Sequence, residues 1–116
     1  MKTKRAFAQE ARDKYWTQVQ GADINALAKW STDVHEKVHQ LETDLVVLKD
    51  AAKMAEAERS KARLVYRKDS NMETLSQWHE SVARLKACNE ELKSKRMEKN
   101  EVQALSEILS KEIKIR

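Results

Sequence analysis

Two histidines four residues apart suggest a metal-binding site, because this spacing places them on one face of a helix. Residues 35–39 read HEKVH, which matches the H-E-x-x-H pattern of zinc proteases. On a helix, histidines at positions i and i+4 share a face and can bind one zinc ion, while the glutamate activates a water molecule. Zinc needs a third protein ligand, and Glu58 lies at a spacing that one such protease family uses. An unbroken heptad runs through Glu58, so no chain reversal brings this ligand back, and we expect neither a metal site nor a cofactor.

Other patterns typical of catalysis are missing from the sequence. The carboxylates all fall among mixed charges, where nothing would shift a pKa for acid–base work. The single glycine excludes a glycine-rich phosphate loop. No serine has a residue that is evidently placed to act as its base. We interpret the single cysteine, Cys88, as a small, partly buried residue. We therefore expect that the protein is not an enzyme.

Basic and aromatic side chains are the better candidates for a binding role. Five basic residues gather near a proposed turn: Arg59, Lys61, Arg63, Arg67 and Lys68. A second basic cluster follows later in the chain: Lys93, Lys95, Arg96 and Lys99. Such clusters either keep a helix surface solvated or dock onto an acidic protein groove or a phosphate backbone. Trp30 and Trp78 pack at the edge of a helix pair or, if exposed, serve as binding hot spots.

A heptad pattern predicts the element that positions these residues. Apolar residues recur at alternating intervals of three and four, which is the seam along which helices wrap around each other. Eleven of thirteen positions are apolar, with Ser31 and Arg59 as the exceptions: Ile24, Leu27, Ser31, Val34, Val38, Leu41, Leu45, Leu48, Ala52, Ala55, Arg59, Ala62 and Tyr66.

A chain reversal is predicted near residues 68–71. Ser70 and Glu73 form an S-x-x-E capping box, which marks the start of a helix. A second, weaker stripe follows at Met72, Leu75, Trp78, Val82, Leu85, Asn89 and Leu92, and returns at Val102, Leu105, Ile108, Leu109, Ile113 and Ile115. Helices of near-equal length over 24–67 and 71–116 predict an antiparallel hairpin in which Val34 meets Leu105 and Ala52 meets Ala87. Without glycine or proline at the turn, a continuous helix remains the alternative.

A shorter helix is predicted before the hairpin. Phe7, Ala11, Tyr15 and Val19 recur every four residues, Gly21 is the expected C-cap and Asp23 the next N-cap. This segment either packs on the open end of the hairpin or stays loose until a partner orders it. The predicted fold is all-α, with a basic helix in residues 1–22 and a coiled-coil hairpin in residues 23–116.

Composition limits the class of protein further. Twenty-three Lys and Arg against nineteen Asp and Glu give a net charge of +4, and no proline interrupts the 116 residues. The charge is mostly mixed, whereas nucleic-acid binders show a denser one-sign face. No apolar run approaches the ~20 residues of a membrane helix, and the N-terminus lacks the apolar core of a secretory signal. One cysteine excludes an internal disulfide and fits the reducing cytoplasm.

The architecture resembles the coiled-coil stalk proteins of flagellar and injectisome (type III) export. The resemblance covers residues 24–116 and rests on hairpin length, the basic tip around Arg59–Lys68 and the charged run ELKSKRMEKNEVQALSEIL at 91–109. Those proteins dock a helical hairpin into a hexameric ATPase, so the resemblance implies an ATPase or another secretion component as partner. The N-terminal segment, residues 1–22, departs from that pattern. Three-helix tubulin-folding cofactors and spectrin-type repeats are similar in size and helix content.

Three functions follow in order of preference. The first is a protein-interaction hairpin acting as an adaptor, stalk or escort chaperone. The second is a self-associating structural coiled coil, which forms a homodimer. The third, and least favoured, is a basic helical protein that binds nucleic acid, with an affinity that falls steeply with salt.

Overall fold

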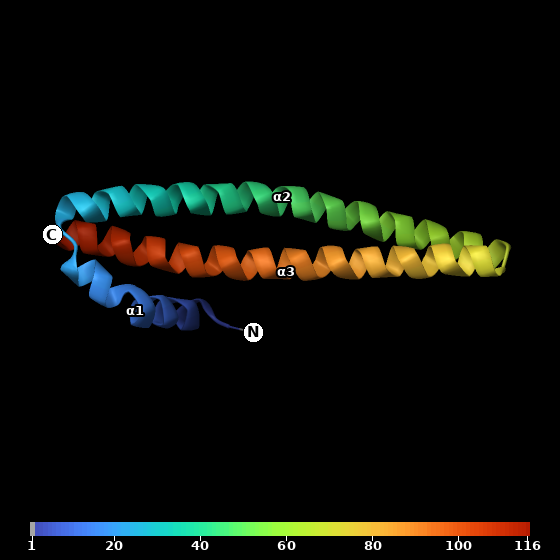
Figure 1. The fold of residues 1–116 in the computed structure, drawn as a ribbon, viewed down its shortest axis with the longest axis horizontal. Coiled ribbons are helices and arrows are strands. Elements are labelled where there is room, and N and C mark those ends of the chain that lie inside the picture. Colours follow the sequence, from blue (N-terminus) through green and yellow to red (C-terminus); the bar gives the residue numbers. More distant parts are fainter. Residues whose placement is uncertain (1) are drawn as a thin grey trace. The chain divides into compact units, whose positions relative to one another are not determined.

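The protein is all-α in the computed structural model, which describes residues 2–116 (Figure 1). Three helices account for the described chain: α1 (Lys4–Gly21), α2 (Ile24–Lys68) and α3 (Met72–Ile115). No strand occurs among the described residues. The predicted fold class and the three predicted helices are confirmed. None of the helices in this described range is long and apolar enough to cross a membrane.

Packing divides the chain into two compact units. Unit 1 combines residues 1–43 with residues 96–116, and unit 2 is residues 44–95. Unit 1 therefore holds α1, the first part of α2 and the last part of α3, whereas unit 2 holds the turn with the helix segments on both sides of it. These units are defined by contacts, so they do not test the predicted division into 1–22 and 23–116.

The core of unit 1 is built by all three helices. Val19 of α1, Leu27 of α2 and Leu109 of α3 are completely buried in one apolar cluster that also contains Val34 and Leu105. Val34 and Leu105, which were predicted to meet, lie in this same cluster. Complete burial of a large aliphatic side chain stabilises a fold by about 1.5–3 kcal/mol. This cluster ties α1 to the two longer helices.

A second cluster in unit 1 fixes the beginning of α1. Phe7 and Ala11 pack against Ala104 of α3, with Tyr15 and Ile108 at the edge. Thr3 caps the helix, because its hydroxyl oxygen accepts a hydrogen bond from the Ala6 amide at 3.2 Å. Of the two alternatives for the first helix, packing on α2 and α3 is the one observed.

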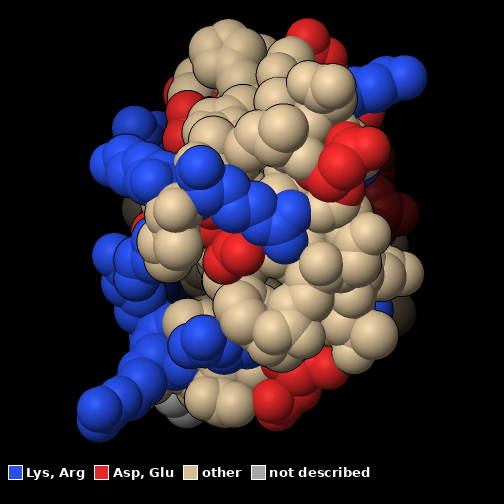
Figure 2. Space-filling model, turned by 90° about the vertical axis from the view of Figure 1, so that its left-hand side faces the viewer, with Lys and Arg blue, Asp and Glu red and all other residues tan. Residues whose placement is uncertain are grey.

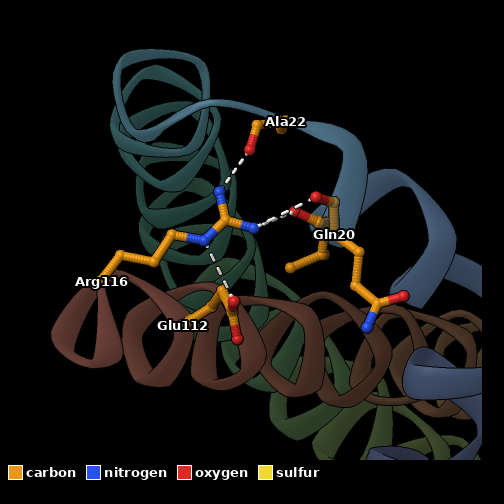
Figure 3. Close-up of polar contacts among 5 residues, drawn as sticks. Gln20, Ala22, Glu112 and Arg116 are labelled. Atoms are coloured by element: carbon orange, nitrogen blue, oxygen red, sulfur yellow. Dashed lines mark hydrogen bonds and ion pairs between the residues drawn. The ribbon is translucent and has the colours of Figure 1, made fainter.

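The end of α1 is held by Arg116, the residue that follows α3 (Figure 3). The guanidinium of Arg116 donates hydrogen bonds to the main-chain carbonyls of Val19 at 3.1 Å, Gln20 at 3.3 Å and Ala22. Its Nε atom donates to the Glu112 carboxylate at 3.1 Å. The last carbonyls of a helix have no partner within the helix, so Arg116 supplies one.

The caps at the α1–α2 connection follow the prediction only in part. Asp23 is the N-cap of α2, since its carboxylate accepts from the Ala26 amide at 2.7 Å, as predicted. Gly21, the predicted C-cap, is instead the last residue of α1, and no glycine here has a positive φ. The residue after it, Ala22, leaves the helix in an extended conformation.

The predicted heptad of α2 lies on its buried side. Leu41 and Leu45 are buried, as are Leu27, Ser31, Val34 and Ala55, and the remaining heptad positions are half-buried except Ile24. Ile24 is 44% exposed at the first residue of the helix. The two polar exceptions obey the same rule, because Ser31 is buried and Arg59 half-buried. Spacing alone therefore located the inward face of α2.

The stripe predicted for the first half of α3 is wrong at three positions. Met72 is 81% exposed, Val82 is 42% exposed and Asn89 is exposed. The inward positions of α3 in unit 2 are Thr74, Trp78, Ser81, Leu85, Cys88, Leu92 and Lys95, all buried or half-buried at intervals of three and four. Small polar residues hold seam positions here, so hydropathy favoured the neighbouring residues instead.

In unit 2 the pairing of α2 with α3 is antiparallel, but an ion pair lies off the predicted register. In unit 2 the Glu58 carboxylate pairs with Arg84 at 3.3 Å, three residues beyond the predicted partner position 81. Ala87, predicted to face Ala52 across the seam, is exposed and does not lie at an inward position of α3.

Candidate partner-binding site

The turn in unit 2 is closed by side-chain hydrogen bonds. Asn71 and Thr74 cap α3 reciprocally: the Thr74 amide donates to Asn71 Oδ1 at 2.9 Å, and the Asn71 amide donates to Thr74 Oγ1 at 3.1 Å. The Thr74 hydroxyl also donates to the Asp69 carbonyl at 2.7 Å. The predicted cap, Ser70 with Glu73, is wrong by one residue, since the Ser70 hydroxyl instead donates to the Tyr66 carbonyl at 2.7 Å.

An aromatic stack stands directly behind this turn. The rings of Tyr66 and Trp78 lie 5.5 Å apart between centroids with an interplanar angle of 29°. Both side chains are half-buried, so Trp78 packs at the seam between the two helices. Stacked aromatic pairs contribute about 0.5–1.5 kcal/mol beyond their burial. The stack and the caps together fix the conformation of the turn and the adjoining helix ends, residues 59–78, which we call the turn end of unit 2.

The basic residues predicted to bind a partner surround the last three turns of α2. Arg59, Arg63 and Arg67 follow one another at intervals of four and form one row along the helix, which we call the arginine row. Arg59 is half-buried at a seam position, whereas Arg63 and Arg67 are exposed. Lys61 and Lys68 are exposed and point from other sides of the helix, because their spacing sets them off the arginine row.

The charge of this segment is not neutralised within the described chain. Residues 59–68 contain five basic residues and no acidic one. None of the five forms an ion pair with any residue in the range 2–116. By contrast, Arg84 of α3 pairs with Glu58 just before the segment. The turn end therefore carries positive charge that no ion pair within the described residues offsets.

Exposed apolar side chains lie beside that charge, and the sequence had not indicated them as binding residues. Val65 is 41% exposed on the last turn of α2, and Met72 is 81% exposed on the first turn of α3. Met72 was assigned to the seam, and the strict three–four spacing of positions 74, 78, 81 and 85 is the signal that excludes it. The structure thus adds apolar contact area to the predicted basic site.

Trp30 belongs to unit 1, so the structure does not bring it into the same site as the other predicted residues. It packs against the buried core of unit 1 and meets Tyr15 edge-on, with ring centroids 6.0 Å apart and an angle of 70°. It is half-buried. Trp30 thus has a clear packing role, and nothing in its surroundings marks it as a binding residue.

Four basic residues in or just before α1 contact other residues of unit 1. Three of them lie over aromatic rings of α1, the pairs being Lys2 over Phe7, Arg12 over Trp16 and Lys14 over Tyr15. Lys2 also pairs with Glu10 at 3.0 Å, and Lys4 with Glu107 at 3.6 Å. Figure 2 shows basic side chains along the left-hand edge of the face nearest the viewer, and acidic ones mainly at its top, centre, right and bottom. This mixed surface differs from the unpaired cluster of residues 59–68.

The first histidine of the HEKVH motif, His35, contacts two serines of the unit 1 seam. The ring of His35 hydrogen-bonds through Nδ1 to the Ser31 carbonyl at 2.7 Å, and its Nε2 atom lies 3.3 Å from the Ser106 hydroxyl. Both serines are buried, with 8% and 7% of their surface exposed. No group of three His, Cys, Asp or Glu residues in the described chain could hold a metal ion. The geometry gives His35 a structural role, linking α2 to α3.

Three grooves flank α1 in unit 1, and their volumes are about 210–250 Å³. Their walls are made by α1 and α3 and include Phe7, Tyr15, Trp16 and Ala104, among charged residues. No histidine, serine or cysteine lines any of the three. Their charged lining residues include Glu10, Lys14 and Glu107.

No protein-family model, curated protein or solved structure matches this chain. The resemblance to export stalk proteins consequently stays a prediction drawn from helix lengths and charge.

Proposed function

We propose that this chain is a non-enzymatic protein-interaction module, an adaptor, stalk or escort chaperone that binds an acidic protein partner with the turn end of unit 2. The observation that carries the proposal is the unpaired basic segment 59–68 on a capped and stacked turn, beside exposed Val65 and Met72. Charge complementarity speeds association and selects partners, and apolar contacts at the centre supply affinity.

The arginine row suggests the kind of surface that would bind. Its side chains recur every four residues, so they match carboxylates that recur every four residues on a partner helix. Arginine also pairs with carboxylates through two parallel hydrogen bonds, which favours a specific docking geometry over a diffuse one. The resemblance stated above makes an ATPase or another secretion component the first partner to examine.

The location we propose is the cytoplasm. Cys88 is a free, half-buried cysteine in the seam of unit 2, and a free thiol is stable where the compartment is reducing. A protein partner in the same compartment would meet the turn end without crossing a membrane.

A charge-reversal variant tests the proposal. Changing Arg63, Arg67 and Lys68 to Glu reverses the exposed charge of the turn end without touching the buried positions. Affinity capture from nuclease-treated cell extract should lose a protein partner with this variant. The matched control changes Lys29, Lys111 and Lys114, three exposed lysines of unit 1, to Glu and should retain that partner. Equal capture by both variants would remove the turn end from the proposal.

The same variants separate protein binding from nucleic-acid binding. A nucleic-acid interface would show an affinity for mixed-sequence duplex that falls steeply with salt. Aromatic side chains for stacking on bases are not free at the turn end, because Tyr66 and Trp78 stack on each other. We expect that neither the unchanged chain nor the control variant binds duplex in a salt-sensitive way. Salt-sensitive duplex binding that the turn-end variant loses would instead indicate a nucleic-acid interface.

A further inference from the structure

A second heptad runs along α2 on the side opposite the seam. Within unit 2 its positions fall at intervals of three and four, and we call them the outer stripe: Val47, Asp50, Met54, Ala57, Lys61 and Leu64. All six are exposed, and the three large apolar side chains are 63%, 67% and 56% exposed at Val47, Met54 and Leu64. Large apolar residues at heptad spacing on a solvent face are typical of a helix that pairs with another helix.

The spacing of the outer stripe is the same whether it is followed from its first residue or from its last. Its intervals are three, four, three, four and three, so they are symmetric about a point between residues 55 and 56. The residue types follow the same symmetry. Val47 mirrors the apolar Leu64, Met54 mirrors Ala57, and Asp50 mirrors the oppositely charged Lys61.

We propose that the outer stripe is a two-fold interface with a second copy of this chain, in which two α2 helices pair antiparallel about that point. Such an interface is self-complementary, since each residue meets its mirror position in the other copy. Val47 would then contact Leu64 of the other copy, and Met54 would contact Ala57. Asp50 of each copy would pair with Lys61 of the other, which gives two ion pairs per dimer.

Charge is what selects a second copy in this orientation. Neither Asp50 nor Lys61 forms an ion pair with any described residue of its own chain. In a parallel pair of α2 helices, Asp50 would face Asp50 and Lys61 would face Lys61, and both contacts repel. Only the antiparallel arrangement turns all four charges into favourable contacts.

The length of the stripe indicates a weak dimer. It spans residues 47–64, about 27 Å of helix at about 1.5 Å per residue. A contact of that length and a helix width buries less than the ~1,200 Å² typical of stable complexes. We therefore expect association that depends on concentration, which favours dimers where the protein is locally concentrated.

Charge swaps test the pairing directly. Sedimentation velocity of the full chain at increasing concentration should show monomers and dimers in exchange. Asp50→Lys or Lys61→Asp alone places like charges together twice per dimer and should weaken dimerisation roughly 10-fold to 30-fold at low salt. The double variant Asp50→Lys with Lys61→Asp restores opposite charges and should recover dimerisation, a rescue that parallel pairing cannot give.

Cysteine cross-linking tests the orientation. In a Cys88→Ala background, chains carrying Val47→Cys are mixed with chains carrying Leu64→Cys and treated with a short bifunctional reagent. The mixture should yield a cross-linked dimer, whereas each variant alone should not, because like positions would lie about 25 Å apart across the two-fold axis. Cross-linking of position 47 to position 47 would overturn the antiparallel pairing.

The remaining outcomes are also decisive. A monomer at every concentration overturns the proposal, and a dimer indifferent to all the swaps shows that another surface dimerises. Circular dichroism should show unchanged helix content for each swap, since both positions are exposed. The Glu variant of Arg63, Arg67 and Lys68 leaves all six stripe residues in place, so loss of partner capture and loss of dimerisation can be told apart.

Discussion

Two adjacent residues of α3 provide a sharp test of which side of this helix faces α2. Ser81 is 3% exposed, whereas Val82 is 42% exposed. Hydropathy assigns Val82 to the seam, and the structure assigns Ser81. Replacing each residue in turn with Asp places the same carboxyl group once in the buried seam, at position 81, and once in solvent, at position 82.

The loss of folding stability expected for Ser81→Asp follows from the burial of this position. A carboxyl group there cannot reach water, so it folds in the protonated form, with a pKa raised well above the ordinary value of about 3.9. Holding it protonated at pH 7 costs up to about 4 kcal/mol, at about 1.4 kcal/mol per pH unit. The hydrogen bond from the Ser81 hydroxyl to the Trp78 carbonyl, 2.6 Å long, is also lost. We expect Ser81→Asp to cost about 3–5 kcal/mol and Val82→Asp to cost less than about 1 kcal/mol.

The pH dependence gives a second readout with a definite sign. The introduced carboxyl has a higher pKa in the folded state than in the unfolded state, so its penalty is absent below about pH 4 and grows as the pH rises. Urea unfolding followed by circular dichroism measures the loss of stability at pH 4 and pH 7. A loss for Val82→Asp equal to that for Ser81→Asp would refute the seam assignment.

Three further changes test other contacts. Leu109→Ala removes a completely buried side chain from the core of unit 1 and should cost about 2–5 kcal/mol in chemical denaturation. Asn71→Ala removes the N-cap of α3 and should cost about 1 kcal/mol, whereas Ser70→Ala should cost less. Arg116→Ala releases the carbonyls at the end of α1 and should speed hydrogen exchange around Ala22, while exchange in unit 2 stays unchanged.

The sequence predicted α2 well because its inward face is marked by both spacing and residue type. Leu41 and Leu45 lie on that face, and so do Ser31 and Arg59, which only the spacing identified. A polar residue inside a strict three–four pattern is recognised as part of the pattern when enough apolar neighbours fix the phase. The length of the run made the phase certain here.

The sequence predicted α3 less well because its inward face lacks that support. Thr74, Ser81, Cys88 and Lys95 hold inward positions in unit 2, and none of them is an aliphatic residue. The neighbouring Val82 drew the predicted stripe to one side, although an exposed valine needs no partner. Burial of small polar residues depends on the opposite helix, which a single helical pattern does not contain.

The predicted binding site shows the same division between local and tertiary information. The basic residues near the turn were found because they are neighbours in sequence. Their lack of ion pairs depends on the three-dimensional positions of carboxylates such as Glu58, which pairs with Arg84 instead. The separation of Trp30 from Trp78 into different units also depends on packing that the sequence does not encode locally.

The two stripes of α2 have a joint consequence for unit 2. Its inner stripe includes Ala52, Ala55 and Ala62, and the facing positions of α3 include Ser81 and Cys88. A seam of small residues buries little apolar area, so it contributes less than a leucine seam would. The outer stripe meanwhile leaves Val47, Met54 and Leu64 in water. A ligand that binds only the folded state adds its binding free energy to the stability of that state. Pairing on the outer stripe or docking at the turn end would therefore stabilise a helix pair whose own seam buries little apolar area.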